Sequence, residues 1–327
     1  MSEYVVQVED LVKRFGRLVA VDGISFAVEP GELFGFLGPN GAGKTTTINI
    51  LCTLSRPTAG RAAVAGFDVV RQQGQVRQCI GLVFQDPSLD EHLSGMQNMR
   101  FHAMVYHVPA AVREERIEQT LRIMELWDRR DSEVRTYSGG MKRRLELARS
   151  MLHHPRVLFL DEPTLGLDPQ TRSRMWDYVL ELRRQEGTTI FLTTHYMDEA
   201  ARADRIAIID QGRIIALDTS ARLKASVGKD VVSVKTDDDA SAAAEIKLRY
   251  QAETRHDGDG VTFEVSNGDE FLPGFIREFS TRILSVSLRR PSLDDVFLKL
   301  TGREMREEEV RDVFKAIVRQ HGRRLRR

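Results

Sequence analysis

Short apolar runs rich in β-branched and aromatic residues recur through the first two-thirds of the chain, and Gly, Pro and Asp bound them. The runs at 33–37, 157–160 and 189–192 are almost continuously apolar, as is typical of parallel strands buried on both faces. Stretches with the 3.6-residue period of an amphipathic helix, such as 171–186, alternate with these runs. The pattern predicts an α/β domain in which these strands share one sheet.

The periodicity changes twice along the chain. Between about residues 94 and 135, stretches such as 112–127 keep the helical period with no strand between them, which predicts a helical insert. After about Leu223, strands and helices are expected in the order β-α-β-β-α, provided that 253–256 also forms a strand, and this order resembles a split βαβ module. The strands are expected at 231–235, 261–265 and 283–288, and the helices at 240–250 and 271–279.

These changes predict three parts. We expect a large α/β domain over 1–222 with a helical subdomain at about 94–150, an α/β accessory domain over 223–302, and a C-terminal helix with a basic tail over 303–327. The last part carries Val310, Val313, Phe314, Ile317 and Val318 on one helical face. A docked helix with a basic end explains this pattern better than contact with anionic lipid.

Composition narrows the function classes. The chain of 327 residues has 48 Lys and Arg against 48 Asp and Glu, and this balance argues against a protein that binds nucleic acid through its overall charge. Cys52 and Cys79 form no C-x-x-C pair, so we expect neither a disulfide framework nor a zinc site. With no signal-peptide pattern and no apolar run near the roughly 20 residues of a membrane span, the chain is expected in the cytoplasm.

A glycine-rich segment follows the first buried strand. It comprises Gly38, Pro39, Asn40, Gly41, Ala42, Gly43, Lys44 and Thr45, fits G-x-x-x-x-G-K-[ST], and opens a helical run from Thr46 to Leu54. Backbone N–H groups in such a loop converge on phosphate oxygens, Lys44 supplies charge to the β- and γ-phosphates, and Thr45 offers its hydroxyl to Mg²⁺. A glycine-rich turn without a ligand is the alternative, and the strand-loop-helix context disfavours it.

Two carboxylates follow the strand at 157–160. Asp161 is placed to hold Mg²⁺, and Glu162 to orient the water that attacks the γ-phosphate. Taken alone, the two carboxylates are best interpreted as an ordinary acidic loop, because such loops commonly follow strands. The phosphate-binding segment upstream favours the functional interpretation instead.

A second glycine-rich helix start lies at Ser138, Gly139 and Gly140, before the helical run 142–152. A helix N-terminus of this kind is another anion site. Two such sites on one chain predict an isologous dimer with two ATP molecules between the subunits.

In this order, the motifs resemble those of the ATP-binding cassette (ABC) ATPases and, within them, the daunorubicin-resistance type of drug-exporter subunit. The matching residues are Phe15, GPNGAGKTT at 38–46, Gln85, YSGGM at 137–141, VLFLDE at 157–162, GLD at 166–168 and His195. The segment 288–302 resembles the tail of the same subgroup. The resemblance implies a P-loop cassette, with a RecA-like core, an antiparallel β subdomain and a helical subdomain, plus a small α+β C-terminal domain.

The resemblance also assigns roles to single residues. It implies that Phe15 stacks on adenine, that Gln85 contacts the metal and the water, and that His195 contacts the γ-phosphate. Ser138, Gly139 and Gly140 would contact the γ-phosphate of the opposing subunit, with Asp168 bridging the subunits, and Thr46 would complete the phosphate-binding segment. Three positions depart from the family pattern: Tyr137 and Met141 stand where Leu and Gln are usual, and Phe15 where Tyr is common.

The expected function is ATP hydrolysis that powers efflux of a drug or another small hydrophobic or lipid-like substrate through a separate membrane permease. The subunit would bind ATP and Mg²⁺ as a homodimer at the cytoplasmic face of the membrane, without nucleic acid. The alternative is a non-transport ABC ATPase that acts on nucleic acid or the ribosome, which the single cassette and the short insert disfavour. A catalytically idle cassette conflicts with the intact Lys44, Asp161, Glu162 and His195.

Overall fold

The computed structural model describes residues 3–86, 88–256 and 260–302, which form two compact units that meet in sequence between Ser220 and Ala221. The predicted C-terminal helix and basic tail over 303–327 lie outside the described residues. Within the described part of the chain, no helix combines the length and the apolar character needed to cross a membrane. Each unit is built around its own sheet and core.

A six-stranded sheet forms the centre of the first unit, in the order β10-β9-β3-β8-β7-β6. Its strands are β3 (Leu33–Leu37), β6 (Ile80–Val83), β7 (Val157–Asp161), β8 (Thr189–Thr194), β9 (Arg205–Asp210) and β10 (Arg213–Asp218). The pairs from β9 to β6 are parallel, whereas β10 joins β9 antiparallel. Every residue of β3, β7 and β8 is buried, which is why these runs are so uniformly apolar.

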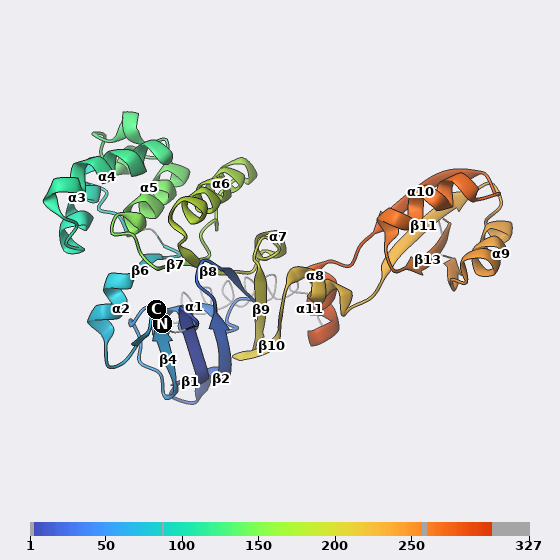
Figure 1. Cartoon of the computed structure of the whole chain (residues 1–327), viewed down its shortest axis with the longest axis horizontal. Coiled ribbons are helices and arrows are strands. Elements are labelled where there is room, and N and C mark those ends of the chain that lie inside the picture. Colours follow the sequence, from blue (N-terminus) through green and yellow to red (C-terminus); the bar gives the residue numbers. More distant parts are fainter. Residues whose placement is uncertain (1–2, 87, 257–259, 303–327) are drawn as a thin grey trace, which may run out of the picture. The chain divides into compact units, whose positions relative to one another are not determined.

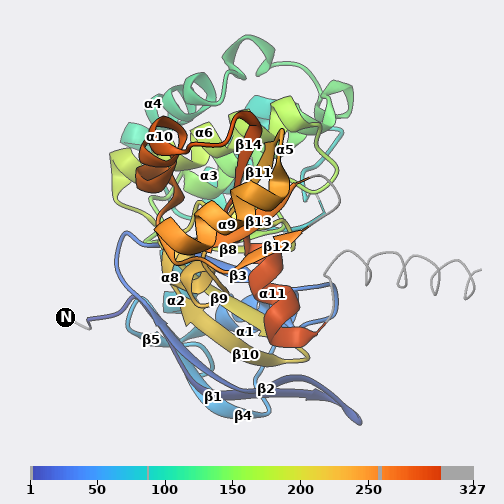
Figure 2. The same cartoon turned by 90° about the vertical axis from the view of Figure 1, so that its right-hand side faces the viewer.

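A second, antiparallel sheet has the order β2-β1-β4-β5. Its strands are β1 (Val6–Phe15), β2 (Leu18–Val28), β4 (Ala59–Val64) and β5 (Phe67–Asp68), and Figure 2 shows β1, β2 and β4 side by side. Aromatic rings join the two sheets in one core. The ring of Phe34 lies 5.4 Å from that of Phe26 and 5.5 Å from that of Phe191.

The α-helices described in the first unit are α1 (Lys44–Leu51), α2 (Gln73–Cys79), α3 (Gly95–Val105), α4 (Ala110–Ile123), α5 (Gly139–Met151), α6 (Pro169–Glu186) and α7 (Met197–Ala200) (Figure 1). The expected helical subdomain corresponds to α3, α4 and α5, which lie together. Two predicted helix ends are wrong. The run to Leu54 ends at Leu51 because Thr53 has a φ of 64°, and the run to 127 ends at Ile123 because Glu125 has a φ of 52°.

The second unit has the order β-α-β-β-α-β between two short helices: α8 (Ser220–Ala225), β11 (Asp230–Thr236), α9 (Asp239–Tyr250), β12 (Thr254–His256), β13 (Val261–Val265), α10 (Gly268–Glu278), β14 (Ile283–Arg289) and α11 (Leu293–Thr301). The sheet is antiparallel in the order β12-β13-β11-β14. Its core packs apolar strand residues such as Val232 and Phe263 against Ile246 of α9 and Phe275 of α10. The split βαβ order is therefore present, including the strand expected at 253–256.

The predicted fold class is confirmed. The first unit has the RecA-like sheet with its antiparallel and helical subdomains, and the second unit is the small α+β domain.

Candidate nucleotide-binding site

The loop between β3 and α1 can be built only with glycine at two positions. Gly43 has a φ of 109°, and a Cβ there would lie 2.5 Å from the carbonyl oxygen of Ala20. A Cβ on Gly38 would lie 2.3 Å from the carbonyl oxygen of Ile209. These close approaches fold the loop tightly and leave the N-terminus of α1 open to an anion.

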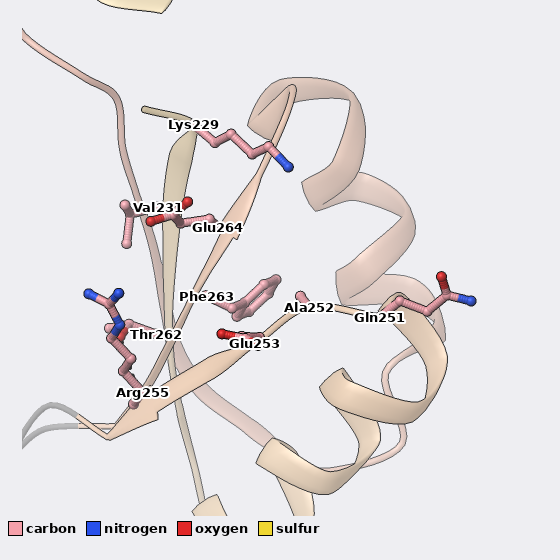
Figure 3. Close-up of a pocket in the computed structure, with 9 residues that line it drawn as sticks. All are labelled: Lys229, Val231, Gln251, Ala252, Glu253, Arg255, Thr262, Phe263 and Glu264. Carbon is pink, nitrogen blue, oxygen red and sulfur yellow. Dashed lines mark hydrogen bonds between the residues drawn. The ribbon is translucent and has the colours of Figure 1, made fainter. Parts of the chain in front are cut away.

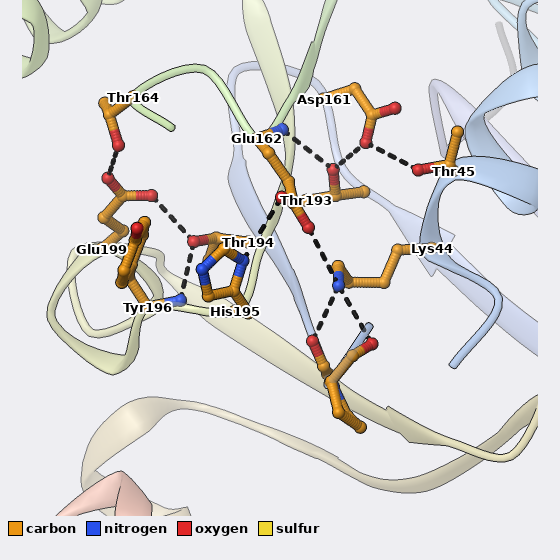
Figure 4. Close-up of polar contacts among 12 residues, drawn as sticks. Lys44, Thr45, Asp161, Glu162, Thr164, Thr193, Thr194, His195, Tyr196 and Glu199 are labelled. Atoms are coloured by element: carbon orange, nitrogen blue, oxygen red, sulfur yellow. Dashed lines mark hydrogen bonds and ion pairs between the residues drawn. The ribbon is translucent and has the colours of Figure 1, made fainter. Parts of the chain in front are cut away.

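Lys44, the first residue of α1, is almost fully buried and contacts several oxygens (Figure 4). Its Nζ donates to the carbonyl oxygens of Gly38 and Pro39 at 2.8 and 3.1 Å. The same Nζ lies 3.0 Å from Oε1 of Glu162. The ammonium group is thus held at the floor of the loop, where phosphate oxygens would meet it.

Asp161 ends β7 and is buried, with its Oδ1 accepting hydrogen bonds from the hydroxyls of Thr193 at 2.5 Å and Thr45 at 3.3 Å. Burial raises the pKa of Asp161, and the two hydroxyl hydrogen bonds oppose that rise. The Asp161 carboxylate and the Thr45 hydroxyl are hard oxygen donors that lie together, as a magnesium site needs.

Glu162 follows Asp161 with a φ of 47°, in the left-handed region that a non-glycine residue rarely adopts. This turn places its carboxylate between Lys44 and His195, whose Nδ1 lies 3.3 Å from Oε2. Burial would raise the pKa of Glu162, but the His195 hydrogen bond and the Lys44 charge outweigh it and bring the pKa to about 2. Glu162 is therefore a carboxylate at neutral pH, able to accept a proton of a bound water.

A buried carboxylate that the sequence reasoning missed connects the loops after β7 and β8. Glu199, on α7, accepts a hydrogen bond from the Thr194 hydroxyl at 2.8 Å and another from the Thr164 hydroxyl (Figure 4). Thr164 follows Glu162 by two residues, and Thr194 precedes His195. Glu199 thus ties the loop that contains Glu162 to the loop that contains His195, although nothing in the local sequence pattern signals a buried acid there.

Lys44, Thr45, Glu162 and His195 line a hollow of about 780 Å³, large enough for a nucleotide. Ten of the predicted site residues line it: Phe15, Asn40, Gly41, Gly43, Lys44, Thr45, Thr46, Gln85, Glu162 and His195. Phe15 ends β1 with 53% of its surface exposed, so its ring face is available to stack on a base. The predicted Gly38 and Pro39 contact Lys44 from beneath, Ala42 is buried in the loop, and Asp161 contacts Thr45.

The remaining predicted residues lie elsewhere. Ser138 caps α5 by accepting a hydrogen bond from the backbone of Met141 at 3.3 Å. Asp168 caps α6 and accepts a 2.6 Å hydrogen bond from the Thr171 hydroxyl. A Cβ on Gly140 would lie 2.6 Å from Cγ2 of Thr171, so the two helix starts are neighbours. Gly139 has open space around it, and none of Ser138, Gly139, Gly140 and Asp168 lines the hollow.

The donor set fits Mg²⁺. One carboxylate and one hydroxyl, with the amide of Gln85 lining the same hollow, suit an ion that keeps several ligands from water and phosphate. Within residues 3–86, 88–256 and 260–302, no cluster of three or more His, Cys, Asp or Glu side chains could hold a metal ion by itself.

The second unit carries a smaller hollow of about 360 Å³ on its sheet (Figure 3). Its lining includes the cations Lys229 and Arg255 and the anions Glu253 and Glu264. These opposite charges do not favour a polyphosphate, so the nucleotide site is assigned to the first unit.

Comparison with known proteins agrees with this geometry. The family model described as "ABC transporter" matches residues 21–165, and the model "ATP-binding protein DrrA1-3-like, C-terminal domain" matches 219–301. The daunorubicin resistance ATP-binding protein DrrA3 of Streptomyces coeruleorubidus is 43% identical over 315 residues, which cover 94% of this chain and 99% of that protein. The chain belongs to the ABC transporter ATP-binding proteins of the daunorubicin-resistance type.

Two further relatives support this assignment to the ABC family. The Nod factor export ATP-binding protein I of Ralstonia nicotianae is 39% identical over 94% of this chain and 96% of its own length. The structure of cbiO1 from Clostridium perfringens, part of the ABC transporter complex cbiONQ, has a TM-score of 0.64 and 27% identity, and the match covers 76% of this chain and 97% of that one. The predicted family is confirmed, and this ABC protein is an ATPase of the exporter type.

Proposed function

We propose that this ABC ATPase powers efflux of a small hydrophobic or lipid-like molecule, with drugs the first class to test, through a separate membrane permease. The names of its relatives support the substrate class, because they describe daunorubicin resistance and Nod factor export. As a subunit that works on a permease, it would lie peripherally at the cytoplasmic face of the membrane.

We further propose that two copies enclose two ATP molecules. The observation that carries this proposal is the division of the phosphate-binding elements between two places. The hollow contains Lys44, Thr45 and Glu162, whereas the helix start at Ser138–Gly140 lies outside it beside Asp168. A second subunit related by a twofold axis would bring its Ser138–Gly140 to the nucleotide, and both sites would be completed at once.

The chain's own residues supply most of the chemistry. Lys44 would leave Glu162 for the phosphates, and Glu162 would then accept a proton of the attacking water while His195 donates toward the γ-phosphate. Asp161 and Thr45 would hold Mg²⁺, which neutralises phosphate charge when bound. Gln85 lines the same hollow from the segment after β6 and would report the presence of the γ-phosphate to the helical subdomain.

Transport tests the function directly. Inside-out vesicles that contain this chain and a permease with about six spans should accumulate daunorubicin when ATP and Mg²⁺ are added, and should not do so with Lys44→Ala. Turnover that is stimulated by nucleic acid or ribosomes instead of by the permease would favour the non-transport alternative.

The shared site is tested separately. With ATP and Mg²⁺, Glu162→Gln should elute as a dimer in sizing chromatography, because this variant keeps the nucleotide bound without hydrolysis. A Glu162→Gln protein that binds ATP and stays monomeric contradicts the two-subunit site.

A further inference from the structure

A buried arginine on α5 contacts the backbone that carries the water-orienting carboxylate. Arg143 is 5% exposed, and its Nε donates to the carbonyl oxygen of Pro163 at 2.5 Å. Its Nη2 donates to the carbonyl oxygens of Asp161 and Glu162 at 3.4 and 3.3 Å. One guanidinium group therefore serves the carbonyls of three consecutive residues.

The turn at Glu162 explains how one side chain can reach these carbonyls. A strand directs successive carbonyls to opposite sides, but the φ of 47° at Glu162 breaks that alternation and turns the carbonyls of Asp161, Glu162 and Pro163 toward Arg143. A non-glycine residue in this region is strained, at a cost in free energy. The hydrogen bonds from Arg143 offset part of that cost, so the strained turn depends on α5.

The same face of α5 holds the segment around Gln85 on both sides. Nη1 of Arg143 donates to the carbonyl oxygen of Phe84, which precedes Gln85. The same Nη1 lies 3.0 Å from Oε2 of Glu146, and Oε1 of Glu146 accepts a hydrogen bond from the backbone N–H of Ser88 at 2.6 Å. The buried Arg143–Glu146 pair thus makes hydrogen bonds to the backbone of Phe84 and Ser88, on either side of Gln85.

We propose that Arg143 is a positioning residue that fixes Glu162 and Gln85 to α5. The first turn of α5 contains Gly139 and Gly140, and Ser138 caps it. In the proposed dimer, α5 therefore carries Ser138–Gly140, which contacts the nucleotide of the partner subunit. Through Arg143, the same helix also holds Glu162, which acts on the nucleotide of its own subunit. The contact with the partner's nucleotide rests on the proposed two-subunit site, whereas the positioning of Glu162 takes place within one chain.

The proposal separates turnover from binding. The described contacts of Arg143 are to the main chain of 84 and 161–163 and to Glu146, and Arg143 does not line the hollow. Its loss should therefore move Glu162 without removing a phosphate ligand. A misplacement of about 1 Å in a reacting group costs about 100-fold in rate, so kcat should fall by about that factor.

The test measures steady-state phosphate release in the assembled transporter and the Kd for a fluorescent ATP analogue. Arg143→Met keeps the apolar stem but leaves Glu146 buried and unpaired, which by itself can destabilise the fold. Arg143→Met/Glu146→Gln removes that unpaired charge while the Gln side-chain oxygen still accepts from Ser88. Arg143→Lys keeps the charge but not the fork of donors.

We expect kcat of the double variant to fall about 100-fold, the Kd to change by less than about threefold, and Arg143→Lys to be intermediate. Arg144→Gln on the same helix is the matched control, because Arg144 donates to the carbonyl of Met124 and contacts Glu125 and Tyr178 instead. Its kcat should stay near that of the parent protein.

The proposal is overturned by a folded double variant that turns over ATP like the parent, or by parallel losses of binding and turnover. If none of the three Arg143 variants folds, the residue serves stability only and the proposal is also overturned. A different measurement tests the two-subunit site: if that site is wrong, Glu162→Gln stays monomeric with ATP. That result would not change the effect of the Arg143 variants on kcat.

Discussion

Lys44 and Glu162 are the two charged residues expected to bind phosphate and to orient water in the hollow. The motifs predict both residues, but they place Lys44 on phosphates and Glu162 on water, and the 3.0 Å ion pair between them follows only from the packing of α1 against the end of β7. Thr193, Glu199 and Arg143 belong to the same network and carry no motif signal, because each lies inside an ordinary strand or helix. Only tertiary structure shows that these side chains are buried against the carboxylate loops.

Substitutions at Lys44 and Glu162 should have different effects. Lys44→Ala removes the cation that would oppose the phosphates, so turnover should fall about 100- to 1,000-fold with weaker ATP binding. Glu162→Gln should lower turnover about 100- to 10,000-fold while ATP still binds. Phosphate release and equilibrium binding, measured on both variants, check this. A Glu162→Gln variant that hydrolyses ATP at the parent rate contradicts the role given to Glu162.

Phe15 should stack on the base without discriminating between adenine and guanine. The ring can stack on any purine but cannot read an amino or keto group, so GTP should compete with ATP within about an order of magnitude. Phe15→Ala should weaken both nucleotides alike, and competition binding measures the two affinities. A strong ATP preference in the parent protein would require another residue that reads the adenine edge.

At the scale of elements, a half-buried aromatic stack lies between the C-terminal ends of α3 and α5, where His153 follows α5. Tyr106 follows α3, and its ring lies 4.4 Å from that of His102 and 4.1 Å from that of His153. Burial, the charge of Arg149 and the neighbouring His153 lower the pKa of His102 to about 3. The folded protein therefore keeps this imidazole neutral under conditions in which the unfolded chain would protonate it.

This difference predicts how acid affects stability. Between pH 6.5 and about 3 the unfolded chain binds a proton at His102 and the folded chain does not, so the free energy of unfolding falls as the pH falls, by at most about 1.4 kcal/mol per pH unit for this group. His102→Phe keeps the stacking and should make that loss shallower. Denaturant unfolding at several pH values measures the slope.

The elements themselves differ in how well a sequence predicts them. Strands β3, β7 and β8 are predictable because each is buried on both faces and contains a continuous apolar run, at 33–37, 157–160 and 190–192. The ends of α1 and α4 are not, since positive φ values at Thr53 and Glu125 come from packing and not from glycine. Sequence motifs place the phosphate loop, whereas the pairing of strands far apart in sequence sets the position of Glu162 beside Lys44.

At the scale of the whole molecule, the residues predicted to bind the nucleotide lie in the first unit, and the second unit has its own core. A protein that ends at Ser220 should therefore bind ATP with a Kd within about threefold of the parent protein, because binding depends on local contacts in the hollow. Coupling to a permease or dimer formation should suffer instead.

The truncated protein must first show a cooperative melt, because the loss of a neighbouring unit can lower stability without touching the site. Equilibrium binding of ATP to that folded protein is the measurement. If it is folded but no longer binds ATP, part of the nucleotide site must be assigned to residues beyond Ser220.

The ion pair between Lys44 and Glu162 also makes Glu162 a tethered competitor of the nucleotide. Its carboxylate occupies the same ammonium group that a phosphate oxygen would use, at the effective concentration that a short tether provides, in the millimolar range. Every measured affinity for ATP then already contains the free energy of displacing this internal anion. Glu162→Gln replaces the competing carboxylate with a neutral amide. Tighter ATP binding by that variant would therefore have two causes: Lys44 no longer pairs with Glu162, and ATP is no longer hydrolysed. ADP, which is not hydrolysed, separates the two contributions: its gain in affinity measures the competition alone.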